Sequence, residues 1–134
     1  MKEMAEQWLK AAEDDLRVVE RLVADDDLTH MVAFHSQQCI EKCCKAIIEE
    51  HELGHIRIHN LSRLFEIVRP KVPLDADVVL IEKIDKLYID ARYPSEFGLL
   101  PDGKPTCADA QEFYACAQSV YRQVKQALAA VPGI

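Results

Sequence analysis

The sequence is poor in several features that would point to other classes of protein. It has four glycines in 134 residues, and aromatic side chains make up 7% of it. No apolar run approaches the roughly 20 residues that a membrane-spanning helix needs, and the N-terminus lacks the apolar stretch of a signal peptide. These absences predict a protein without a membrane segment, located in the cytoplasm.

Positive charge is also scarce. The sequence has 16 Lys and Arg residues and 23 Asp and Glu residues, which gives a formal net charge of −7. This balance argues against a protein that grips nucleic acid through a broad basic face. It leaves open a small local site built from a few Arg and Lys residues.

The cysteines do not form a disulfide framework. They number five, an odd count, and Cys39, Cys43 and Cys44 fall within one helix-like run. We therefore predict thiols, as is usual in a reducing compartment. His35, Cys39 and Cys43 follow one another at steps of four, but structural zinc sites usually draw close Cys-x-x-Cys pairs from separate turns. We predict no metal and no cofactor.

The sequence is rich in helical periodicity. Apolar residues recur at offsets of three and four, and no segment alternates between apolar and polar residues as a half-buried strand does. The pattern predicts four long helices and one short helix, over residues of about 2–24, 29–52, 60–68, 75–91 and 106–130. With 49% apolar residues, one core needs no metal or disulfide. We predict a single all-α domain over residues 1–134, an antiparallel up-down four-helix bundle with an additional short helix as a crosspiece.

Helix-ending and capping residues mark several boundaries. One of the acidic residues 25–27, or Thr29, is expected to cap the second helix, and Gly54 to end it. Asp75 is expected to cap the fourth helix. Thr106, followed by Asp109, predicts a capped fifth helix with an acidic first turn.

The second helix is apolar over an unusually wide arc. A helix of this kind usually touches neighbours on two sides. Two interpretations remain open: the segment is the centre of the bundle, or part of it also forms a dimer seam.

Several local patterns together resemble one family. They are Trp8-Leu9-Lys10-Ala11-Ala12, Gln37-Gln38-Cys39-Ile40-Glu41-Lys42, Lys45-Ala46, His59-Asn60-Leu61 and Arg92-Tyr93-Pro94. Their order resembles HEPN domains, which often read Gln-Gln-Ala-Glu-Lys, then Lys-Ala, His-Asp-Leu and Arg-Tyr-Pro. The resemblance implies a helical bundle that pairs into homodimers, often beside a minimal nucleotidyltransferase in a toxin–antitoxin pair.

The chain departs from the pattern of the ribonucleases in that family. Those members carry an Arg followed, after four to six residues, by a His. No Arg in this sequence has a His at that spacing. Because RNA cleavage by acid–base chemistry needs a proton-transfer group beside the 2′-hydroxyl, the sequence favours a non-catalytic protein.

The candidate ligand-binding residues are Arg92, Tyr93, Lys42, Lys45 and His59. Arg92 offers a fork of donors for phosphate and Tyr93 a stacking face for a base; alternatively, Arg92 pairs with a nearby carboxylate and Tyr93 packs on the bundle. Lys42 and Lys45 either meet phosphates or pair with acidic residues of the first helix. His59 either caps the short helix or points into the same polar pocket as Arg92.

Three functions therefore compete. The first is a dimeric nucleotide-binding module that works with a nucleotidyltransferase, with a nucleotide or RNA as ligand. The second is a ribonuclease toxin with a divergent active site. The third is a structural module that mediates assembly.

Overall fold

A computed structural model describes residues 1–92 and 104–129, without the side chains of residues 90–92. The described residues contain five helices and no strand, which confirms the predicted all-α class. The helices are α1 (Glu3–Leu22), α2 (Thr29–Glu50), α3 (Leu61–Val68), α4 (Val78–Arg92) and α5 (Cys107–Ala129). None of these helices is both long and apolar enough to cross a membrane.

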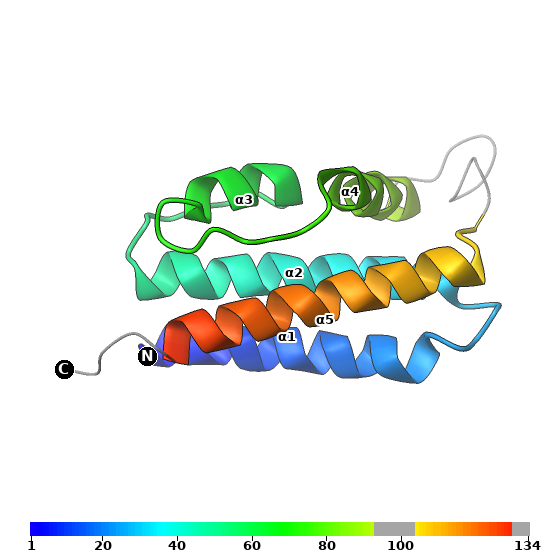
Figure 1. Cartoon of the computed structure of the whole chain (residues 1–134), viewed down its shortest axis with the longest axis horizontal. Helices are drawn as coiled ribbons and strands as arrows, with labels where there is room; N and C mark the ends of the chain where they lie inside the picture. The colour runs from blue at the N-terminus through cyan, green and yellow to red at the C-terminus, as the bar shows by residue number, and fades with distance from the viewer. Residues whose placement is uncertain (93–103, 130–134) are drawn as a thin grey trace.

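The long helices α1, α2 and α5 run along the molecule together, as Figure 1 shows. On the opposite side of α2 from α1 lies the pair α3 and α4, and α4 is seen nearly end-on in that view. The helix that crosses the long axis is therefore α4, whereas the sequence predicted a crosspiece in the short helix α3. This arrangement leaves α2 in contact with all four other helices.

The wide apolar arc of α2 is buried by other helices of the same chain. Its fully buried side chains include Ile40, Ile47 and the three thiols Cys39, Cys43 and Cys44. Because neighbours cover α2 on both sides, the arc marks the centre of the bundle. It gives no support to a dimer seam on this helix.

All five cysteines lie in the described part of the chain, and each is a free thiol, as predicted. Burial raises the pKa of the Cys43 thiol well above its ordinary value. A thiol in this environment stays neutral and acts as a small apolar group.

The start of α5 has the predicted cap. The Asp109 backbone N–H donates to the Thr106 hydroxyl at 3.0 Å, and the Thr106 N–H donates to the Asp109 carboxylate at 3.0 Å. This reciprocal pair satisfies two backbone donors that the first turn of a helix leaves unpaired.

Two other predicted caps are wrong. Helix α2 begins after Leu28 without a side-chain cap, and no hydrogen-bond partner for the buried Thr29 hydroxyl lies among the described residues. Asp77, not Asp75, caps α4, since its carboxylate accepts from the N–H groups of Val79 and Leu80 at 2.9 and 3.3 Å.

The chain turns at a different residue after α2 than the sequence predicted. The left-handed residue that follows the helix is Glu52, with φ of 52°, and the Leu53 N–H reaches back to the Ile48 carbonyl at 3.0 Å. Gly54, also left-handed with φ of 113°, comes two residues later. An ion pair between Glu52 and Lys2 at 2.7 Å accompanies this turn.

Candidate functional site

A polar row follows α2 at steps of four residues, through Gln37, Glu41 and Lys45. All three side chains are buried, although residues of this kind are usually exposed. Each is satisfied by a hydrogen bond, which is the usual condition for burying polar atoms. The row faces the connection between α2 and α3, which the sequence did not indicate.

Glu41 and His59 form the centre of this row. The Nδ1 atom of His59 lies 2.9 Å from Oε1 of Glu41, while 59% of the His59 side chain is exposed. The Gln37 amide donates to the same carboxylate oxygen at 3.2 Å and to the His59 carbonyl at 3.0 Å. His59 therefore pairs with α2, and the cap of α3 is its neighbour Asn60, which accepts from the Arg63 N–H at 2.9 Å.

Lys45 is fixed by the same connection. Its ammonium donates to the Ile56 carbonyl at 2.6 Å, and the side chain is buried. No carboxylate of the first helix takes part in this contact. The charge thus lies beneath the connection, beside Glu41 and close to His59.

The connection exposes a row of side chains above Lys45. His55, Arg57 and His59 are exposed, whereas Ile56 and Ile58 between them are half-buried against the core. This alternation is typical of an extended backbone, in which successive side chains point to opposite sides. One face of the connection is therefore polar and basic.

These elements meet in a cavity of about 350 Å³, which we call the Trp8 pocket. It is lined by Trp8 of α1, by residues of the polar row and α2, and by the exposed residues of the connection. The lining residues are Trp8, Glu41, Lys45, Ile48, Glu49, Gly54, His55, Ile56, Arg57 and His59. The pocket combines a half-buried aromatic ring with several hydrogen-bond donors, and it unites Lys45 and His59 of the predicted site.

Lys42 lies elsewhere, between α1 and α2. Its ammonium is 2.7 Å from Oδ2 of Asp15, and Nδ1 of His35 is 2.9 Å from Oδ1 of the same carboxylate. This is the ion-paired alternative for Lys42. Burial acts to raise the pKa of Asp15, but hydrogen bonds from His35 and Lys42 outweigh it and hold the pKa below its usual value.

Asp85 of α4 is the third buried carboxylate, after Glu41 and Asp15, and the sequence did not reveal it. It accepts from the Leu61 N–H at 2.9 Å and from the Ser62 N–H at 3.4 Å, at the start of α3. Burial, with the nearby charge of Glu41, raises the pKa of Asp85. The carboxylate thus joins α4 to the first turn of α3.

Arg92 and Tyr93 are the remaining predicted residues. Arg92 is the last residue of α4, and its side chain lies outside the described residues, as does the whole of Tyr93. Their assignment to a ligand site stays a prediction. As for metal ligands, the described part of the chain holds no cluster of three or more His, Cys, Asp or Glu side chains placed for an ion.

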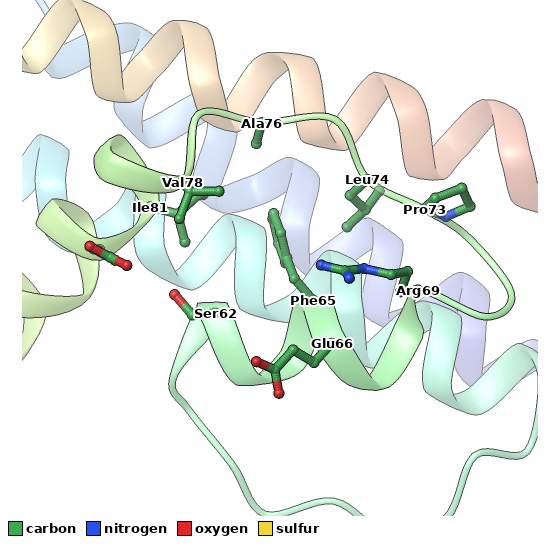
Figure 2. A pocket seen from close by; sticks show the side chains of 10 residues that line it. Ser62, Phe65, Glu66, Arg69, Pro73, Leu74, Ala76, Val78 and Ile81 are labelled. Atoms are coloured by element: carbon green, nitrogen blue, oxygen red, sulfur yellow. The ribbon is translucent and has the colours of Figure 1, made fainter.

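A second cavity, of about 260 Å³, lies between α3, the following connection and the start of α4. Figure 2 shows the Phe65 ring in this cavity, with the Arg69 guanidinium directed towards it and Leu74 above them. Val78 and Ile81 close the side formed by α4. We call this cavity the α3–α4 pocket.

Three comparisons place this fold among known proteins. The model of the HEPN domain family matches residues 5–127. A protein named "Putative toxin MJ1304", from Methanocaldococcus jannaschii, is 30% identical over 135 residues, which cover 92% of this chain and 88% of that protein. The crystal structure of ST0689, described as an archaeal HEPN homologue, matches with a TM-score of 0.68 and 28% identity, covering 96% of this chain and 99% of that chain. The chain therefore belongs to the HEPN domain family.

Proposed function

We propose that this chain is the HEPN component of a toxin–antitoxin-type pair, that it acts as a homodimer, and that its partner is a minimal nucleotidyltransferase. The observation that carries the proposal is the similarity to a protein named as a toxin over 92% of this chain, within the HEPN family. The similarity extends along the chain and is not confined to one motif.

The proposal includes a bound nucleotide, and the Trp8 pocket supports it. The Trp8 ring offers a face on which a base can stack. Arg57 offers a guanidinium fork for phosphate, and the buried Lys45 ammonium adds a positive charge to the lining of the same pocket. A volume of about 350 Å³ lies within the range of small-molecule sites.

The proposed nucleotide site is tested by a thermal-shift screen against mononucleotides, because a ligand that binds only the folded state raises the melting temperature. Affinities are then measured by calorimetry for wild type and Arg57→Ala. We expect the variant to lose about tenfold or more in affinity, since a charge-assisted contact is removed. Arg63→Ala is the matched control, because Arg63 is also exposed but pairs with Glu66 on α3, outside the pocket.

Arg92→Ala separates the two candidate sites. Loss of affinity in Arg92→Ala, with none in Arg57→Ala, would move the site to the end of α4. Wild-type affinity in both variants would contradict the nucleotide proposal at either place.

The toxin–antitoxin role has its own test. Expression of the chain alone in a bacterial host should slow growth, and co-expression of a minimal nucleotidyltransferase from the same genome should restore growth. The two proteins should also purify together. Normal growth under strong expression, with no co-purification, would contradict this role.

A ribonuclease is the second candidate function, and the Glu41–His59 pair favours it. A carboxylate that holds one nitrogen of an imidazole leaves the other nitrogen available for proton transfer, and the His59 ring is more than half exposed. If the chain cleaves RNA in the presence of chelator, His59→Ala should abolish cleavage and Arg63→Ala should not. Cleavage that persists in His59→Ala would remove this role from His59.

A further inference from the structure

Helix α4 carries most of the large apolar side chains that the described part of the chain exposes. Val78, Val79 and Ile89 are 65%, 72% and 51% exposed. The others are Met1 and Met4, at the N-terminal end. Exposed apolar residues gathered on one helix suggest an interaction surface more than scattered ones do.

The two faces of α4 differ in composition. The buried face packs on α2 and α3 and comprises Ile81, Ile84, Asp85 and Tyr88. A separate exposed stripe comprises Val79, Glu82, Lys86 and Ile89. Figure 1 shows α4 on the side of α2 away from α1, where none of the labelled helices lies beyond it.

The spacing of the exposed stripe is that of a helix–helix seam. Its members follow one another at three, four and three residues, which keeps them on one line of the helix and matches the seam of paired helices. From first to last they span about 15 Å at 1.5 Å per residue. The stripe has apolar ends and a charged middle.

This order is self-complementary for a second copy of the chain. In a two-fold symmetric contact, residue i of one copy meets residue j of the other, and j meets i. An antiparallel pairing of two α4 helices about residue 84 sets Val79 against Ile89 of the second copy, and Glu82 against Lys86 of the second copy. Every apolar residue then meets an apolar one, and every charge meets its opposite.

We infer that the Val79–Glu82–Lys86–Ile89 stripe of α4 is the interface through which two copies of this chain pair antiparallel. The inference rests on the proposed homodimer and adds its location and orientation. A seam of three turns is smaller than a standard stable interface, so we expect a dissociation constant of roughly micromolar size.

The same geometry involves the α3–α4 pocket. Val78 and Glu82 line that pocket and adjoin the stripe. In the antiparallel pair, the C-terminal turn of one α4 lies beside the N-terminal turn of the other. The second copy thus borders the pocket that contains Phe65 and Arg69.

A charge-swap experiment on the full chain tests the interface. Dissociation constants are measured by sedimentation equilibrium at low salt for wild type, Glu82→Lys, Lys86→Glu and the double variant. Each single substitution sets like charges opposite each other twice per dimer, and we expect it to weaken the dimer about tenfold or more. The double variant restores opposite charges, and its dissociation constant should return to within about threefold of wild type.

One substitution at an apolar residue of the stripe and one control complete the design. Val79→Asp should abolish dimerisation at tens of micromolar protein, and Met4→Asp, at a similarly exposed residue outside the stripe, should not change it. Circular dichroism and the melting temperature confirm that each variant is folded. A wild-type dimer that neither Val79→Asp nor the charge reversals weaken would overturn this interface while leaving the dimer intact. A wild-type chain that is still monomeric at about 100 μM, roughly a hundred times the expected dissociation constant, would overturn both the homodimer and its proposed interface.

Discussion

Helices α2 and α4 both carry apolar residues on more than one side, yet they occupy opposite kinds of position. Every large apolar side chain in the middle of α2 is covered, because α1, α3, α4 and α5 all contact this helix. Helix α4 packs by one face only and leaves Val78, Val79 and Ile89 exposed.

The contrast between α2 and α4 shows that the amount of apolar surface on a helix does not locate an interface between chains. The sequence pointed to α2 as a possible seam because its apolar arc is the widest. That arc is used within the chain, since a helix with neighbours on two sides needs one. The smaller excess on α4 is the part left uncovered, and there the charges also match a second copy.

The largest effect is expected from truncating the covered face of α2. Ile47→Ala removes a fully buried side chain and should lower the free energy of unfolding by about 2–5 kcal/mol, through lost transfer free energy and a cavity. Chemical denaturation followed by circular dichroism measures it. A loss under about 1 kcal/mol would mean that α2 is less tightly surrounded than the structure shows.

A smaller effect is expected on the buried face of α4. Asp85→Ala deprives the Leu61 and Ser62 N–H groups of their acceptor and should cost about 1–3 kcal/mol. Asp85→Asn is the matched variant, because its amide oxygen still accepts a hydrogen bond, and it should cost less. Equal losses in the two variants would show that the negative charge matters more than the hydrogen bonds.

The sequence predicts a structural feature best when the residues that determine it are close together in the chain. Helix positions and the Thr106–Asp109 cap follow from residues within a few positions of one another. The Asp77 cap, two residues from the predicted Asp75, and the left-handed Glu52 show that neighbouring candidates are harder to separate. Asp75 contacts α5, where its backbone N–H donates to the Gln123 side-chain oxygen at 2.9 Å.

The polar contacts were harder to predict from the sequence because the residues that form them are far apart in the chain. Asp15 is one of three consecutive acidic residues with Glu13 and Asp14, and its partners His35 and Lys42 lie 20 and 27 positions away. No local pattern distinguishes it from its neighbours. Lys45 and His59 were named from the sequence, but only the fold brings them together with Trp8.

A still smaller effect is expected at the α1–α2 contact. Asp15→Asn removes the charge that pairs with Lys42 and His35 and should cost about 1–2 kcal/mol at pH 7. The pKa of Asp15 is lowered in the folded protein, so its stabilising contribution is complete above the unfolded-state pKa. It is lost as the pH falls through the folded-state pKa.

The pH dependence separates this explanation from a simple packing defect. The difference between wild type and Asp15→Asn should shrink as the pH falls below about 4. Asp14→Asn, at the exposed neighbouring position, should match wild type throughout. A difference that stays constant between pH 7 and pH 3 would contradict the ion pair.

The smallest effect on stability is expected on the exposed face of α4, where it isolates assembly from folding. Val79 is 72% exposed, so Val79→Ala should change the free energy of unfolding of the monomer by no more than about 0.5 kcal/mol. The same substitution removes apolar contact from both ends of the proposed seam and should weaken the dimer measurably in sedimentation. Unfolding is therefore measured at protein concentrations well below the dissociation constant, and assembly well above it. A loss of more than about 1 kcal/mol in the monomer would show that Val79 is covered within the chain, and that α4 resembles α2 more than the structure indicates.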